Sequence, residues 1–360
     1  MAQIDAFFKL MNDEGASDLH MVAGQQPILR IRGDMERVKF KKMENDELRG
    51  MLYEICPEER IKEFEETGDI DFGYEIPGLA RYRCNYFQQK YGVGAVFREI
   101  PSEIMTCDQL GLPKVISRLA QLPKGLVLVT GPTGSGKSTT LAAIVDEANK
   151  TRKDHILTVE DPIEFVHRSQ KAIINHREVG THTKSFSAAL RGALREDPDI
   201  ILVGEMRDLE TISLAMEAAM TGHLVFGTLH TINAMKTVDR IIEIFPANQQ
   251  GQVRSTLADA LRAVVSQTLF KRIDVKGRCA AQEILIATPA VRNLIREGKT
   301  FQLLSVMQTG KKFGMQTLDD AIVAYLDKKM ISPDEAYSNC VEKAKFAKYL
   351  KKPPSDFTEV

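Results

Sequence analysis

The chain has 360 residues, which exceeds the size at which one hydrophobic core usually stops growing, so two domains are expected. Its 48 Lys and Arg residues nearly balance its 49 Asp and Glu residues, so no nucleic acid is expected as a partner, although a local basic patch stays open. The five cysteines are far apart and never form C-x-x-C, which argues against a disulfide framework and a zinc ribbon. No apolar stretch has the length of a membrane span and the N-terminus is acidic, so we expect a cytoplasmic protein.

Residues 1–100 mix strand and helix patterns and are predicted to form an α+β domain. Residues 28–38 indicate two short strands around a Gly-Asp turn, and residues 45–68 indicate two helices separated by a proline. Residues 81–87 and 93–100 are predicted to be strands of an antiparallel pair.

A second domain is predicted after residues 101–122, which contain Pro101, Gly111 and Pro113 and indicate a linker with a leading helix. Over residues 123–289, short apolar runs alternate with helical segments, as in a parallel sheet covered on both faces. The runs are LVLVTG (126–131), HILTVE (155–160), DIILVG (199–204) and HLVFGTLH (223–230). This alternation predicts an α/β domain, and residues 290–360 are predicted to be helical.

One segment of this second domain predicts a phosphate-binding loop. Gly131–Ser138 fits G-x-x-x-x-G-K-[ST] between an apolar strand and a helical pattern. Glycines there let backbone N–H groups surround a polyphosphate, and the following helix points its positive end at the same anion. Lys137 is expected to reach the β- and γ-phosphates, and Ser138 to ligate Mg²⁺. We therefore predict an ATP site with the loop residues Thr133, Gly134, Ser135, Gly136, Lys137, Ser138 and Thr139.

Two acidic segments are predicted to lie at the same edge of the sheet as this loop. Glu205 directly follows one predicted strand, where its carboxylate can hold Mg²⁺ or its hydration shell. Glu160, Asp161 and Glu164 follow another. Hydrolysis needs one carboxylate for the metal and one to orient and deprotonate water. A solvated strand end is the alternative for either segment alone.

His223 and His230 bracket the predicted strand LVFGTL. Six intervening residues place them at opposite ends of it, so they are not expected to bind one metal ion. Both are interpreted as polar residues near the nucleotide edge, where they can sense the γ-phosphate or position a neighbouring carboxylate. A hydrogen-bonded core histidine is an equally open interpretation of His223.

Four ordered segments together resemble the Walker A, Asp box, Walker B and His box motifs of the secretion ATPase superfamily. They are GPTGSGKST (131–139), HILTVEDPIEF (155–165), LRGALREDPDIILVGEMRD (190–208) and TGHLVFGTLHT (221–231). ASDLHM (16–21) and AVRNLIREGKT (290–300) are similar to segments of the type IV pilus retraction ATPases within that superfamily. The assembly and type II secretion ATPases carry a tetracysteine zinc insert after the His box, and this sequence has no such insert.

The resemblance implies a homohexamer with an N-terminal PAS-like domain and a C-terminal RecA-like ATPase domain, using ATP and Mg²⁺. It also implies a cytoplasmic protein, peripheral at the inner membrane, that works with a platform protein of the pilus machine. Val291 and Phe301 depart from the retraction pattern, and Phe301 leaves room for a paralogous or accessory retraction ATPase. An assembly or secretion ATPase and a nucleotide-gated adaptor are less favoured functions that the sequence leaves open.

Residue roles carried over from the resemblance place Glu164 as catalytic base, Glu205 as the Walker B acid, and Glu160 and Asp161 as supporting residues. Arg83 and Arg98 match N-domain arginines that reach the phosphates, with Arg81 as a neighbour. Arg191 and Arg195, four residues apart on a predicted helix, are further candidate arginines near the site or a subunit interface. The alternative is that they lie on a solvated face of that helix. The segment 290–297 is either a retraction-specific surface or a helix packed on its own domain.

Overall fold

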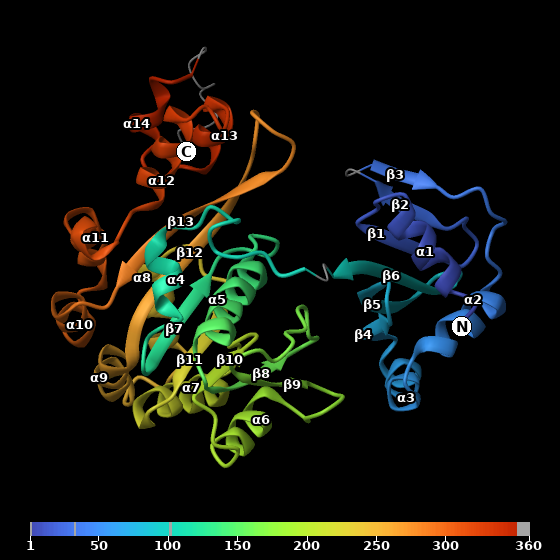
Figure 1. Cartoon of the computed structure of the whole chain (residues 1–360), viewed down its shortest axis with the longest axis horizontal. Helices are drawn as coiled ribbons and strands as arrows, with labels where there is room; N and C mark the ends of the chain where they lie inside the picture. The colour runs from blue at the N-terminus through green and yellow to red at the C-terminus, as the bar shows by residue number, and fades with distance from the viewer. Residues whose placement is uncertain (1, 32–33, 101–102, 351–360) are drawn as a thin grey trace. The chain divides into compact units, whose positions relative to one another are not determined.

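The computed structural model describes residues 2–31, 34–100 and 103–350. The chain forms two compact units, one made of Met1–Glu103 with Asp161–Val166 and the other of Ile104–Glu160 with His167–Val360. Each unit is described by itself below (Figure 1). Among the described residues, we find no helix that is both long enough and apolar enough to cross a membrane.

The first unit is built on a six-stranded antiparallel sheet with the strand order β3-β2-β1-β6-β5-β4. Its strands are β1 (Asp18–Val22), β2 (Ile28–Ile31), β3 (Asp34–Arg37), β4 (Asp69–Ile76), β5 (Ala80–Gln89) and β6 (Gly92–Ile100). Its helices are α1 (Asp5–Asp13), α2 (Asn45–Ile55) and α3 (Glu58–Thr67). The predicted strands and helices of this region are confirmed, whereas Gly33 of the predicted turn lies outside the described residues.

The core of this unit lies on one face of the sheet, because buried and half-buried residues alternate along β5. Tyr82 and Tyr86 point into the core, and Phe8 of α1 stacks on Tyr82 with ring centroids 4.2 Å apart. Arg81 and Arg83 alternate with the buried residues and therefore lie on the other face. The alternation thus separates an aromatic core from a face that carries arginines.

The second unit is built on a seven-stranded sheet with the strand order β13-β12-β7-β11-β10-β8-β9, parallel except for β13. Its strands are β7 (Gly125–Thr130), β8 (His155–Glu160), β9 (Ile173–Glu178), β10 (Ile200–Val203), β11 (Leu224–Leu229), β12 (Leu261–Lys271) and β13 (Arg278–Ile286). Its first helices are α4 (Lys114–Leu119), α5 (Lys137–Thr151), α6 (Phe186–Ala193), α7 (Leu209–Thr221), α8 (Ala234–Glu243) and α9 (Gln250–Ala260). The α/β architecture predicted from the alternating runs is confirmed.

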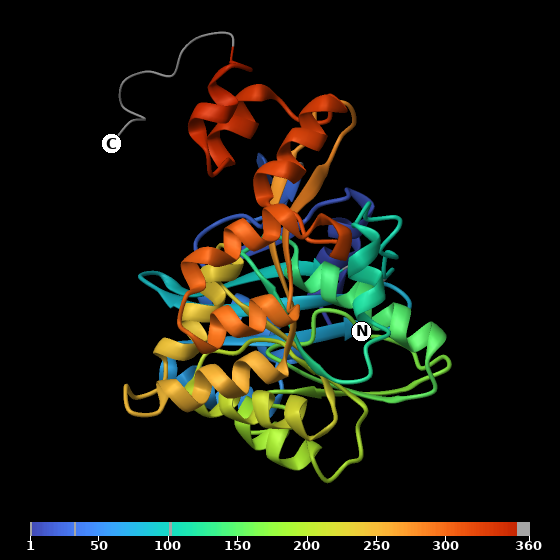
Figure 2. The same ribbon diagram turned by 90° about the vertical axis from the view of Figure 1, so that its left-hand side faces the viewer.

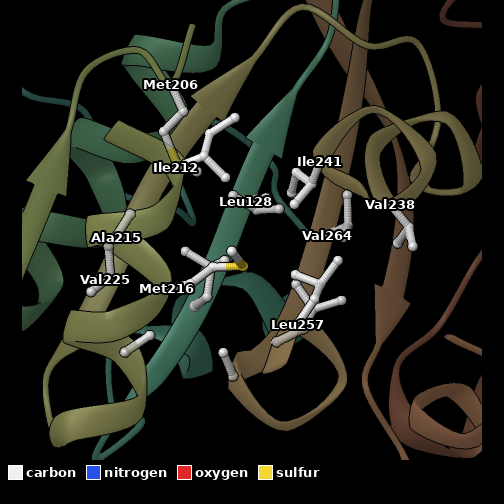
Figure 3. Packing of buried hydrophobic residues seen from close by; sticks show 14 of the residues in the cluster. Leu128, Met206, Ile212, Ala215, Met216, Val225, Val238, Ile241, Leu257 and Val264 are labelled. Carbon is white, nitrogen blue, oxygen red and sulfur yellow. The ribbon is translucent and has the colours of Figure 1, made fainter. Parts of the chain in front are cut away.

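Successive residues of β7 serve two hydrophobic cores, one on each face of this sheet. Leu126 and Leu128 pack with residues of α7, α8 and α9, and Figure 3 shows Leu128 among Met206, Ile212, Ile241 and Val264. Val127 and Val129 pack with α4 and α5 on the opposite face. The central strand is therefore buried on both sides, which explains its unbroken apolar sequence.

The C-terminal part of the unit is helical, as predicted, and two regions are distinguished by what they pack against. The helices are α10 (Pro289–Arg296), α11 (Leu303–Thr309), α12 (Leu318–Asp327), α13 (Pro333–Asn339) and α14 (Lys343–Ala347). α10 and α11 contribute to the core that includes Leu128. α12 to α14 gather at the far end of the β12–β13 hairpin, where Phe270, Ile322 and Phe346 are buried together (Figure 2).

Helix α6 ends earlier than the sequence pattern predicts. It stops at Ala193, so Arg195 does not share a helix face with Arg191. Asp197 directly precedes Pro198 and has a positive φ of 53°. A proline disfavours the α-helical conformation of the residue before it. Arg191 forms an ion pair with Glu210 at the start of α7.

Candidate nucleotide-binding site

The phosphate loop connects the carboxyl end of β7 to the first turn of α5, as the motif predicts. Gly131, Gly134 and Gly136 have φ values of +142°, +76° and +85°, which residues with a side chain rarely adopt. Successive backbone N–H groups can then converge on an anion at the N-terminal end of a 15-residue helix. The loop therefore fits a polyphosphate.

The side chain of Lys137 lies across this loop. Its Nζ donates hydrogen bonds to the carbonyl oxygens of Gly131, at 2.9 Å, and Pro132, at 3.1 Å. Ser138 follows it in the first turn of α5, which is the position from which a serine hydroxyl ligates Mg²⁺ in phosphate loops. The loop thus combines a cation for phosphate oxygens with a hydroxyl for the metal.

The order of the strands brings the four predicted motifs to one edge of the sheet. β7, β11, β10 and β8 are parallel neighbours, so their carboxyl ends lie at the same edge. From there the chain continues into the phosphate loop after β7, His230 after β11 and Glu205 after β10, while Glu160 ends β8. The chain order of the motifs differs from this spatial order, in which the His box lies between the phosphate loop and the Walker B segment.

Glu205 is held by two basic side chains. His230 Nε2 lies 3.0 Å from its Oε1, and Arg207 Nη2 donates to its Oε2 at 2.6 Å. Burial opposes ionisation of this carboxyl, but the hydrogen bond and charge of Arg207, together with His230, outweigh it and lower its pKa. Glu205 is therefore an anion that a divalent cation can use.

Glu160 lies beside Gly204, the residue before Glu205, because a Cβ built on Gly204 would be 3.2 Å from the Cα of Glu160. Its Oε1 is 4.0 Å from Nδ1 of His176 in β9, and Thr158 shares a hydrogen bond of 2.8 Å with the same nitrogen. This agrees with a supporting position for Glu160 at the edge that holds Glu205.

Glu164 and the exposed Asp161 belong to the segment 161–166, which is part of the first unit. Arg83 Nη1 lies 3.7 Å from Oε1 of Glu164, and its Nε donates to Asp71 at 2.9 Å. The hydrogen bond with Asp71 raises the pKa of Arg83 although burial opposes this. Arg81 donates to the carbonyl oxygen of Ile163 at 3.3 Å. The predicted base and a predicted arginine are therefore neighbours.

Arg83 and Arg98 are direct cross-strand partners in the β5–β6 pair. Like charges at such positions repel each other. The repulsion is relieved on one side by Asp18, the buried partner of Arg98 in β1, whose Oδ1 accepts from Arg98 Nε at 2.8 Å. Asp71 pairs with Arg83 on the other side. The structure thus places the two predicted arginines side by side on the face of the sheet opposite the aromatic core.

Helix α10 contains most of the predicted segment 290–297 and packs on its own unit. Val291 and Ile295 are buried in the core, with Leu294 against it, as the apolar stripe predicts. Arg296 pairs with Asp259 at 2.5 Å and is exposed. Core packing of the apolar side therefore leaves Arg296 on the surface.

Two side chains at this edge were not predicted from the sequence as site residues. Arg207, the partner of Glu205, lies within the Walker B segment but has no distinguishing spacing. His176 approaches Glu160 from β9, a strand that the sequence pattern did not predict. Only the pairing of β8 with β9 brings His176 to this position.

The family described as Type II/IV secretion system protein matches residues 4–294. The type IV pilus retractation ATPase PilT of Pseudomonas aeruginosa is 55% identical over 332 residues, which cover 92% of this chain and 95% of that protein. A twitching motility protein of Neisseria gonorrhoeae is 52% identical over 310 residues, which cover 86% of this chain and 83% of that protein. The crystal structure of the pilus retraction motor PilT with bound ADP matches with a TM-score of 0.88 and 44% identity, covering 96% of this chain and 98% of that chain.

Proposed function

This chain belongs to the Type II/IV secretion system protein family, and on that basis we propose that it is an ATPase that powers the retraction of type IV pili. The observation that supports this most is the convergence of the phosphate loop, His230, Glu205 and Glu160 at one sheet edge. A nucleotide at the phosphate loop agrees with the ADP bound in the similar retraction motor. The identity of more than half over most of the chain favours retraction over pilus assembly or secretion.

In the proposed mechanism, the phosphate loop and Lys137 hold the β- and γ-phosphates. Ser138 and Glu205 would hold Mg²⁺, which supplies charge neutralisation when it is bound, and His230 keeps the Glu205 carboxylate aligned. Glu164 takes a proton from the attacking water. Arg83 and Arg98 neutralise charge that develops on the phosphate, for which their side-by-side placement on the sheet face is suited.

The proposed assembly is a homohexamer that works in the cytoplasm at the inner membrane, with a platform protein of the pilus machine as its partner. A PAS-like character of the first unit and cooperation with a paralogous retraction ATPase are part of the same proposal. Hydrolysis would be converted into movement of the first unit, since closure around a nucleotide is a common way to couple binding to motion.

Deletion of the gene tests this function. We expect hyperpiliated cells that no longer twitch, because pili would still assemble but would not retract. Reintroducing the wild-type chain should restore twitching, and reintroducing a Glu164→Gln chain should not. Cells without pili would identify an assembly ATPase. Full twitching with the Glu164→Gln chain would identify a nucleotide-gated adaptor.

A further inference from the structure

Gln267 of β12, a strand outside the four motifs, holds the phosphate loop from behind. The side chain is buried, and its Nε2 donates a hydrogen bond of 2.6 Å to the carbonyl oxygen of Ser135. Its Oε1 accepts a hydrogen bond of 2.8 Å from the hydroxyl of Thr140 in α5. One amide group therefore ties both the loop and the helix that follows it to the neighbouring strand.

The glycines of the loop lie against the same residue. A Cβ on Gly131 would be 2.3 Å from the carbonyl oxygen of Gln267, and a Cβ on Gly136 would be 2.9 Å from its Nε2. Real Cβ atoms do not approach other atoms this closely, so a side chain at Gly131 would displace backbone, and one at Gly136 would displace the Gln267 side chain. Both ends of the loop are thus shaped by contact with Gln267.

The hydrogen bond to Ser135 fixes the direction of one loop N–H. In a trans peptide, the C=O and N–H bonds point in opposite directions. The carbonyl of Ser135 points at the Gln267 side chain, so the N–H of Gly136 points away from β12. Inward-facing N–H groups of this kind are what phosphate loops present to their anion.

We propose that Gln267 is a positioning residue for nucleotide binding, which turns the Ser135–Gly136 peptide so that the Gly136 N–H faces the phosphates. This inference rests on the proposed ATPase function and names a residue that sets the affinity of its nucleotide site. Gln267 acts through the loop backbone, so its loss should affect nucleotide affinity more than the proton transfer assigned to Glu164.

A matched pair of variants separates this role from general packing. Gln282 is the cross-strand partner of Gln267 and is equally buried; it lies on β13, and its Nε2 reaches Oε1 of Gln267 itself, at 3.5 Å, rather than the loop. We expect Gln267→Met to weaken ADP binding, measured by calorimetry, by about tenfold or more, since a buried carbonyl loses its donor and the loop peptide is free to turn. Gln282→Met should bind ADP within about twofold of the wild-type chain. Thermal melting of both variants checks that each is folded.

Gln267→Glu adds a second readout, the pH dependence of ADP binding, which reports on the hydrogen bond to Ser135. Its ionised carboxylate cannot donate to Ser135, whereas its protonated form has an O–H donor and a carbonyl acceptor, like the amide. Burial raises the pKa of such a carboxyl, so protonation begins near neutral pH. The ratio of the ADP dissociation constants of Gln267→Glu and wild type should therefore fall as the pH is lowered from about 9 to about 6.

The outcomes are distinct. Weak binding by Gln267→Met, near-normal binding by Gln282→Met and a pH-dependent deficit in Gln267→Glu would support the proposal. ADP affinity within twofold of wild type in Gln267→Met, equal losses in both methionine variants, or a pH-independent ratio for Gln267→Glu would overturn it. A wild-type chain that binds no ADP would instead refute the proposed function.

Discussion

Nε2 of His230 lies 3.0 Å from Oε1 of Glu205, at the carboxyl ends of the adjacent parallel strands β11 and β10. The His box and the Walker B acid thus meet through a side-chain contact as well as through the sheet. Arg207 contacts both carboxylate oxygens, with Nε 2.5 Å from Oε1 and Nη2 2.6 Å from Oε2, so Glu205 is oriented from two sides. This arrangement favours the second of the two roles predicted for His230, the positioning of a neighbouring carboxylate, and we propose that role.

Replacement of His230 by Ala should reduce ATP turnover about tenfold or more while nucleotide affinity changes little, because the Glu205 carboxylate loses one of the groups that align it. Steady-state ATPase assays and ADP calorimetry provide the two readouts. His223→Ala is the matched control. His223 lies at the other end of the same strand, so its predicted place near the nucleotide edge is wrong, and its Nδ1 is 3.0 Å from the carbonyl oxygen of Ala218. Equal effects of the two substitutions would mean that His230 has only a structural role.

Glu164→Gln should retain nucleotide binding and lose turnover by about 10²-fold or more, because an amide cannot accept the proton of the attacking water. Lys137→Ala should instead weaken nucleotide binding itself, since a phosphate ligand is lost. Calorimetry and ATPase assays on both variants separate binding from turnover. Near-normal turnover in Glu164→Gln would remove this residue from the role of base, and tight binding by Lys137→Ala would contradict the assignment of the loop.

Motif spacing predicted the residues that lie at strand ends, because the carboxyl ends of parallel strands share one edge whatever their order in the chain. It could not predict which ends adjoin. Spacing alone does not reveal that β11 lies between β7 and β10, and this strand order brings His230 to Glu205. The contact of Gln267 with Ser135 could not be predicted for a related reason, because it depends on the pairing of β12 with β7.

The end of α6 shows where local periodicity misleads. The pattern of apolar residues continues to Leu194, and Arg191 and Arg195 have helical spacing. The helix nevertheless stops at Ala193, and Pro198 disfavours the helical conformation at Asp197 directly before it. In the first unit, by contrast, the alternation along β5 is enough to place Arg83 on the face opposite the aromatic core.

His167 should make the chain less stable in mild acid. Burial, with a smaller contribution from the charge of His176, lowers its pKa to about 4, below that of about 6.5 in an unfolded chain. Between these values the unfolded chain binds more protons, so stability is fully present above about pH 6.5 and falls towards pH 4 by at most ~1.4 kcal/mol per pH unit. Urea unfolding at pH 5 and pH 7.5 measures the loss.

His167→Phe, which cannot titrate, is the control for this effect. It should unfold with a smaller difference in free energy between the two pH values than the wild-type chain, even if its stability at pH 7.5 is lower. Identical pH dependence in the two chains would show that other groups cause the acid sensitivity.

Arg292→Ala combined with Arg296→Ala should separate force transmission from hydrolysis. Helix α10 buries Val291 and Ile295 in the core, and it contributes no residue to the sheet edge that holds the phosphate loop and Glu205. We therefore expect ATPase activity within a few-fold of wild type while pilus retraction fails, as when an output surface is lost and transition-state binding is kept. A matched control replaces Lys311 and Lys312 by Ala, which removes two positive charges from another exposed part of the C-terminal region and should leave retraction intact. Both activities are measured for each double variant. Loss of ATPase activity together with retraction would place α10 in the catalytic assembly, and retention of both would make it a packing helix without a role in output.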